Sequence, residues 1–182
     1  SSWTDSCRRW LGRCSQAPRA AMAGVEQSLR EQLCGLWEVL EAGAAGLAAA
    51  RHPLVMVVRR ALRLELDALW HVLRAARATN AAVVTWDGIE GGEALCRGAF
   101  SLDGFRSLPD PGAAFVVRRA AAQVNGWADA AELVLHAAER GDVAHVPRIL
   151  HRAPAPPKPP GRAALAAVAR HLARVAPQAR AS

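Results

Sequence analysis

Apolar residues recur at spacings of three and four along much of the chain, which is the period of an amphipathic helix. This pattern predicts helices over residues 22–50 and 54–78, separated at Pro53, which ends the first or starts the second. The first stripe consists of Val25, Leu29, Leu33, Leu36 and Leu40. The second consists of Leu54, Val58, Leu62, Leu66, Leu69 and Leu73. The two segments are therefore expected to form a helical hairpin.

The remaining chain is divided by turn-forming residues. Residues 81–92, "AAVVTWDGIEGG", are the least helical part and predict a short extended piece followed by turns. Asp110 and Pro111 form a good helix start, a carboxylate cap followed by proline at the first helical position. Further helices are expected over residues 93–100, 111–125, 128–140, 143–152 (distorted at Pro147) and 162–176. In the last of these helices, Leu165, Val168, Leu172 and Val175 share one face and Arg170 and Arg174 lie opposite.

Composition favours the same class of fold. Alanine and leucine dominate the apolar residues, aromatic residues make up only 5% and tyrosine is absent, which suits packed helices better than a β-sandwich. The predicted fold is all-α, an irregular helical bundle or a short stack of helical hairpins with basic terminal extensions. It divides into a basic N-terminal extension (1–21), an α-helical domain (22–152), a proline-rich linker (153–161) and a basic C-terminal amphipathic helix and tail (162–182).

A partial repeat supports the hairpin interpretation. "LWEVLEA", residues 36–42, returns as "LWHVLRA", residues 69–75. The first segment resembles the Leu-Trp segments of octotricopeptide-type repeats, which bind RNA, and "HAAERGDVAHVPRIL", residues 136–150, resembles an ankyrin helix pair. Ankyrin's T-P-L-H turn is missing, and Asp103 stands where a third tryptophan would fall. The echo is therefore interpreted mainly as two core helices of similar composition, with a helical-repeat adaptor as one alternative.

Charge is concentrated at the two ends. Residues 143–182 carry six arginines and Lys158 without any acidic residue, while residues 1–142 balance 16 arginines against 16 acidic residues. The whole net charge of +7 therefore lies in the last 40 residues. Residues 1–20 are also basic, and such ends usually meet phosphate, anionic lipid or an acidic protein surface.

No motif for catalysis, cofactor binding or metal binding is recognised. The chain lacks a nucleophile elbow, a P-loop, a zinc-protease motif and a dinucleotide fingerprint, and His136, His145 and His151 have no metal-site spacing. Asp67 and His71, four residues apart, are interpreted as a surface ion pair. The "TWDG" segment is expected to anchor a loop or to shape a pocket. The chain is predicted not to be an enzyme, with no catalytic residue, cofactor or metal.

The candidate binding residues are all arginines. Arg59-Arg60 and Arg118-Arg119 each follow a Val-Val dipeptide, in "VMVVRRAL" and "AFVVRRAA". Each arginine pair could contact phosphate or lie on a solvated helix face. The candidates for contact with a polyanion or a partner are Arg8, Arg9, Arg13, Arg59, Arg60, Arg118, Arg119, Arg162, Arg170 and Arg174.

These patterns predict an accessory subunit of a large organellar assembly, first of all a mitochondrial ribosome. The alternatives are a peripheral subunit of a respiratory-chain or ATP synthase complex, and a helical-repeat adaptor that binds protein or RNA. The expected partners are other subunits of the complex. RNA is a further candidate partner, and so is anionic lipid at the C-terminal helix. No transmembrane span is expected. The Arg- and Ser-rich opening predicts a mitochondrial location, in the matrix or at the matrix face of the inner membrane; another organelle or the cytoplasm is the alternative.

Overall fold

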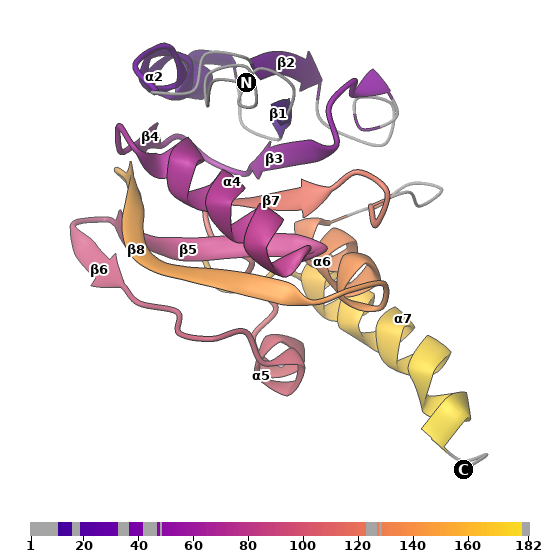
Figure 1. The fold of residues 1–182 in the computed structure, drawn as a ribbon. Coiled ribbons are helices and arrows are strands. Elements are labelled where there is room, and N and C mark those ends of the chain that lie inside the picture. Colours follow the sequence, from indigo (N-terminus) through magenta and orange to yellow (C-terminus); the bar gives the residue numbers. More distant parts are fainter. Residues whose placement is uncertain are drawn as a thin grey trace.

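The protein is an α/β structure built on a mixed, curled sheet with helices on both faces (Figure 1). The computed structural model describes residues 11–15, 19–32, 37–41, 47, 49–122, 127 and 129–179. The predicted all-α class is wrong, because several segments with a helical spacing of apolar residues form strands instead.

The elements alternate along the described chain. The strands are β1 (Leu11–Ser15), β2 (Trp37–Glu41), β3 (Leu54–Val58), β4 (Arg63–Leu64), β5 (Val83–Glu90), β6 (Glu93–Leu95), β7 (Ala114–Arg118) and β8 (Val143–Ala153). The helices are α2 (Arg19–Arg30), α4 (Ala68–Thr79), α5 (Leu102–Ser107), α6 (Ala130–Ala138) and α7 (Arg162–Ala179). "LWEVLEA" thus falls on strand β2 and "LWHVLRA" on helix α4, so the sequence echo is not a structural repeat.

The direction of the strands brings several of their ends together. The order across the sheet is β2-β1-β3-β7-β5-β8-β4, with β6 paired to the end of β5. β1, β2 and β3 are parallel, β7 is antiparallel to both β3 and β5, and β8 is parallel to β5. β1, β2, β3, β5 and β8 therefore all point the same way. Their carboxyl ends lie along one side of the sheet, here called the carboxyl edge, where β7 begins.

Strand β3 shows why a helical spacing was misleading. Every position of "LVMVV" is buried, and adjacent residues join opposite cores. Met56 faces the core formed with α2 and α4, whereas Val55 and Val57 face the core formed with α6 and α7. A run that is apolar throughout satisfies a period of 3.6 as well as a period of 2, so the sequence pattern alone does not choose between helix and strand.

Three of the expected helices are present, and the others are replaced or cut short. The second half of segment 54–78 is α4, and segments 128–140 and 162–176 contain α6 and α7. Segment 22–50 instead holds α2 and β2, and residues 93–100, 111–125 and 143–152 include β6, β7 and most of β8. The proline expected to distort a helix lies in β8, between Val146, which pairs with Trp86, and Ile149, which pairs with Asp87. Such a bulge tolerates a residue without an N–H group.

Helix α7 packs with a different face from the one expected. Leu165 and Leu172 are 54% and 43% exposed, whereas Ala164, Ala167 and Val168 are buried. Small side chains at the buried positions let α7 approach closely, and it lies beside α6 (Figure 1). Among the described residues, no helix combines the length and the apolar character needed to cross a bilayer.

A matched pair of leucine substitutions tests this packing. Leu133 in α6 is fully buried and Leu172 in α7 is 43% exposed. Leu133→Ala is expected to lower the free energy of unfolding by about 2–5 kcal/mol, because it leaves a cavity in the core. Leu172→Ala is expected to change it by about 0.5 kcal/mol or less. Denaturant unfolding of both variants measures the difference, and equal losses would contradict the placement of α7.

Candidate functional site

Charged side chains gather at the carboxyl edge of the sheet. Arg59 and Arg60 directly follow β3, Asp87 and Glu90 lie in the second half of β5, and His151 lies near the end of β8. In open α/β sheets, ligands bind outside the carboxyl ends of the strands, beside the point where the strand order reverses. Here β1 lies between β2 and β3, so this point is next to β3 and the arginine pair. The carboxyl edge is therefore the candidate site.

Five side chains at this edge form a row of alternating charge. Arg59 Nη1 lies 2.6 Å from Asp110 Oδ1, and Asp110 Oδ2 lies 3.2 Å from Arg97 Nη1. Arg97 Nη2 lies 3.2 Å from Glu90 Oε1, and Glu90 Oε2 lies 3.0 Å from Arg60 Nη1. With three guanidinium groups and two carboxylates, the row carries one net positive charge, and an arginine stands at each of its ends.

Glu90 is the buried centre of this row. Its side chain is fully buried. Burial alone raises the pKa of a carboxyl group, but the hydrogen bond to His151 and the charges of Arg60 and Arg97 outweigh it and hold the pKa of Glu90 at about 2. The carboxylate is thus ionised at neutral pH, and its charge is neutralised inside the protein.

The hydrogen bonds of His151 define its tautomer. The indole Nε1–H of Trp86 donates to His151 Nδ1 over 3.0 Å, so Nδ1 carries no proton. The other nitrogen, Nε2, lies 3.3 Å from Glu90 Oε1 and donates to it. A neutral imidazole therefore links the indole to the buried carboxylate. Gly88 makes room for the ring, because a Cβ atom at that position would lie 2.0 Å from His151 Cε1.

A second polar group lies on the same strand. Thr85 Oγ1 is 3.1 Å from His145 Nδ1, and His145 Nε2 is 3.1 Å from Asp87 Oδ1. The same Asp87 oxygen accepts the backbone N–H of Arg97 over 2.8 Å. This group anchors the backbone of Arg97 against β5, while Glu90 and Asp110 hold its guanidinium group, so both the backbone and the side-chain end of Arg97 are held in place.

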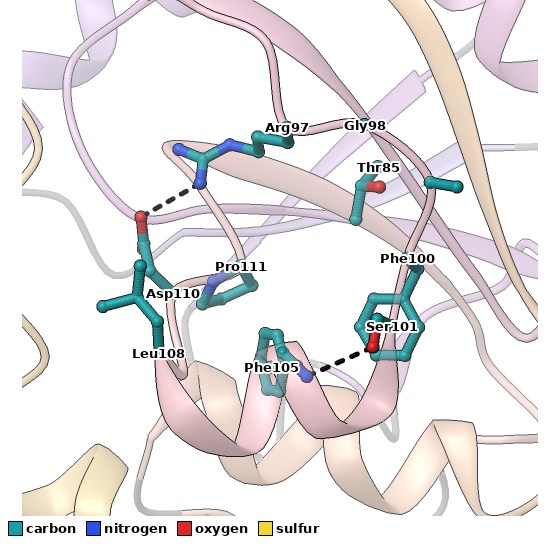
Figure 2. A pocket seen from close by; sticks show the side chains of 11 residues that line it. Thr85, Arg97, Gly98, Phe100, Ser101, Phe105, Leu108, Asp110 and Pro111 are labelled. Atoms are coloured by element: carbon teal, nitrogen blue, oxygen red, sulfur yellow. Dashed lines mark hydrogen bonds and ion pairs between the residues drawn. The ribbon is translucent and has the colours of Figure 1, made fainter.

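A cavity of about 280 Å³ opens beside the row (Figure 2). Arg97 and Asp110 lie on one side of it, while the rings of Phe100 and Phe105 lie on another, 5.5 Å apart between centroids. Thr85 of the "TWDG" segment contributes to the wall, as expected if this segment shapes a pocket. The cavity combines one ionic side with one apolar side, which suits a ligand with both kinds of surface.

A larger cavity of about 610 Å³ shares Arg97 and Asp110 with the first. Its other wall is the proline-rich segment 157–160, which includes Lys158. This segment is held at Pro156, whose carbonyl accepts a hydrogen bond from Arg60 Nη1 over 3.1 Å. Gly91, with φ of +64°, allows the close approach, because a Cβ atom there would lie 2.8 Å from Pro156 N.

Only one of the two Val-Val-Arg-Arg pairs lies at this edge. Arg59 and Arg60 do, whereas Arg118 and Arg119 follow an antiparallel strand and lie at the opposite edge. Arg118 donates to the carbonyls of Ala76 and Ala81, and Arg119 donates to that of Ala50. The second pair therefore has backbone partners at the far end of the sheet.

The predicted arginines of the C-terminal helix have acidic partners within the chain. Arg170 Nε lies 3.0 Å from Glu132 of α6, and Arg174 Nη2 lies 3.0 Å from Glu139, which directly follows α6. The expectation that no acidic residue balances this helix is thus corrected. Arg162 is exposed at the start of α7 and Arg13 lies in β1. Arg8 and Arg9 lie outside the described residues.

Sequence reasoning missed most of the row. Glu90 and Arg97 belong to no motif, Asp110 was interpreted as a helix cap, and the ion pairs to Arg59 and Arg60 join residues that are distant in sequence. The one available signal was that Arg59 and Arg60 end an apolar run, as side chains at the end of a buried strand do. The expected ion pair of Asp67 and His71 is confirmed at 3.0 Å. Among the described residues, no three His, Cys, Asp or Glu side chains are placed to hold a metal ion.

Comparison with known proteins identifies solved structures with a similar fold. No protein-family model and no curated protein matches the chain. The fold is similar to the crystal structure of S. aureus TarS 1-349, with a TM-score of 0.58 and 11% identity over 79% of this chain and 60% of that one. The complex of TarS 1-349 with UDP-GlcNAc gives a TM-score of 0.59 and 10% identity, over 85% and 60%. The complex with UDP gives 0.56 and 11%, over 79% and 60%.

This likeness corrects the function expected from the sequence. The predicted non-catalytic ribosomal subunit, its respiratory-chain alternative and the repeat adaptor were inferred for an all-α chain with basic ends, whereas the structure is an α/β fold. The prediction that the chain is not an enzyme rested on the same ground and on missing motifs. The observed fold is instead shared with a protein crystallised with UDP-GlcNAc and with UDP. At 10–11% identity the likeness shows the fold, and the chain spans about 60% of the length of TarS 1-349.

Substitution of Gly88 tests the position of His151. Gly88→Ala would place a methyl group within the imidazole ring, so we expect the ring to move and the bonds to Trp86 and Glu90 to break. Loss of buried hydrogen bonds to a charged group is expected to cost about 2–4 kcal/mol of unfolding free energy. Gly161→Ala is the matched control, since nothing lies within 4 Å of a Cβ atom there. Equal stability of the two variants would contradict the packing of Gly88 against His151.

The pH dependence of stability tests Glu90. Its pKa is about 2 in the folded protein and 4.5 ordinarily, so its carboxylate stabilises the fold above pH 4.5 and loses this effect as the pH falls toward 2. The loss over this interval is about 3 kcal/mol. Glu90→Gln is expected to be less stable at neutral pH and to show a correspondingly flatter acid dependence. Urea unfolding between pH 2 and 7 measures both, with exposed Glu93→Gln as control; equal slopes for wild type and Glu90→Gln would contradict the assignment.

Proposed function

We propose that this chain is a glycosyltransferase-type domain that binds a nucleotide sugar at the carboxyl edge of its sheet. The observation that carries the proposal is the shared fold with TarS, a protein crystallised with UDP-GlcNAc and with UDP. UDP is what remains when the sugar leaves UDP-GlcNAc. The two ligands are therefore the donor and the product of a sugar transfer, and a protein that holds both fits that reaction.

The geometry of the carboxyl edge supports donor binding there. A nucleotide sugar combines a charged diphosphate with a sugar and a base, and it needs cationic groups beside a cavity with apolar and polar walls. At the carboxyl edge, Arg97 lines two cavities of about 280 and 610 Å³, and the guanidinium groups of Arg59 and Arg60 lie farther along the same row. The order β2-β1-β3 also places the reversal of strand order beside Arg59 and Arg60.

The proposed reaction is transfer of a glycosyl group to an acceptor hydroxyl. The acceptor oxygen forms a bond to the sugar carbon, the bond from that carbon to the diphosphate oxygen breaks, and the electron pair leaves with the nucleoside diphosphate. The hydroxyl proton passes to a base. Because the chain spans about 60% of TarS 1-349, the proposal concerns donor binding and the class of reaction, and it names neither acceptor nor base.

Nucleotide binding is the direct test. UDP at about 100 times its Kd is expected to raise the free energy of unfolding by about 2.7 kcal/mol, because a ligand that binds only the folded state stabilises it. UDP-GlcNAc, UDP and the diphosphates of adenosine, guanosine and thymidine are compared by calorimetry and thermal unfolding. N-acetylglucosamine and uridine at the same concentration are the controls. The proposed function would be contradicted if none of the nucleotides raised the unfolding temperature or gave a binding signal in calorimetry.

A further inference from the structure

The sequence contains the segment Val-Val-Arg-Arg twice, and the fold gives the two copies opposite positions. Val58 pairs with Ala114 and Leu54 pairs with Arg118, so β3 and β7 run in opposite directions. The arginines after β3 therefore lie at the carboxyl edge, and those at the end of β7 lie across the sheet from them. Position relative to the strand ends separates two dipeptides that are identical in chemistry.

The first pair retains unused hydrogen-bond donors. Arg59 donates only from Nη1, to Asp110 Oδ1 over 2.6 Å and to the Gly112 carbonyl over 2.8 Å. Arg60 likewise donates only from Nη1, to the Pro156 carbonyl, and the same Nη1 forms an ion pair with Glu90. The Nε and Nη2 groups of both arginines have no hydrogen-bond partner among the described residues. Their side chains are 24% and 19% exposed, so these donors can reach a ligand while Nη1 keeps its protein partners.

The two carboxylates of the row already have arginine partners, and Asp87, the third carboxylate at this edge, lies against His145 and the backbone N–H of Arg97. Glu90 lies between Arg60, Arg97 and His151, and Asp110 lies between Arg59 and Arg97. A divalent cation bound with a nucleotide usually needs one or two carboxylates beside the phosphates. Here such a cation would have to displace an arginine from Glu90 or Asp110, and this would leave a partly buried guanidinium group without its partner. Direct contact between arginine and phosphate requires no such rearrangement.

From these observations we propose that Arg59 and Arg60 bind the diphosphate of the nucleotide directly, so that guanidinium groups neutralise its charge in place of a carboxylate-held cation. This inference rests on the proposed function, because it concerns the same ligand. It predicts that a nucleoside diphosphate binds without a divalent metal ion. Its binding should depend on Arg59 and Arg60 and not on Arg118 and Arg119.

The test compares two matched double variants, Arg59→Lys with Arg60→Lys and Arg118→Lys with Arg119→Lys. Lysine keeps the positive charge beside Glu90 and Asp110 but lacks the planar fork with its additional donors. UDP binding to the full chain is measured by calorimetry in magnesium and in excess EDTA. Wild type is expected to bind equally in both. The first variant is expected to bind about tenfold more weakly or worse, as follows from losing one charge-assisted hydrogen bond, and the second as wild type does.

Competition with wild type gives a second measurement that no folding defect can obscure. Pyrophosphate is expected to displace UDP in EDTA, whereas adding salt of the same ionic strength is not. Binding that requires magnesium, equal binding by all three proteins, or UDP that pyrophosphate does not displace would each overturn the arginine assignment while leaving nucleotide binding in place. A wild type that binds no nucleotide in either buffer would overturn the proposed function and this inference together.

Discussion

The buried carboxylate of Glu90 is the constraint on which the carboxyl edge depends. Its side chain is fully enclosed, and an uncompensated charge there would cost several kcal/mol. Arg60, Arg97 and His151 supply the compensation, and they come from the end of β3, the segment after β6 and the end of β8. Neutralising one charge thus draws three separate parts of the chain together. The row of three arginines and two carboxylates keeps one excess positive charge, which favours an anionic ligand.

Strand direction decides which of two identical dipeptides lies at the carboxyl edge, where the ligand site is proposed. The hydrogen-bond register of β3 against β7 sends Arg59 to the carboxyl edge and Arg118 to the far one. At the far edge, Arg118 donates a hydrogen bond to the carbonyl of Ala76 near the end of α4. The C-terminal end of a helix stabilises a cation because its free carbonyl groups carry partial negative charge. The two arginine pairs have the same local chemistry, so the difference between the proposed ligand contact at one edge and the backbone contacts at the other comes from topology.

Part of the fold could be predicted and most of the site could not. Helices α4 and α7 were found because polar residues interrupt their apolar residues with a helical period, and α6 was found between the turn signals Asn125-Gly126 and Gly141. Strands β3 and β7 were read as helix because nearly every position is buried, which erases the alternation that marks a strand. Within the site, Arg59 and Arg60 were identified as candidates for phosphate contact. Their carboxylate partners were missed because ion pairs across 30 to 51 residues leave no spacing to detect.

The sequence by itself determined where apolar segments begin and end, where glycine and proline interrupt them, and how charge is distributed. These are local properties, set by each residue's own side chain and its near neighbours. Only the tertiary structure decided whether an all-apolar run became helix or strand, because that choice depends on what covers each of its faces. It also decided which charges meet. Arg170 and Arg174 have no acidic neighbour in sequence, but they lie against Glu132 of α6 and Glu139 directly after it, since helix packing rather than chain distance sets the neighbours of a charge.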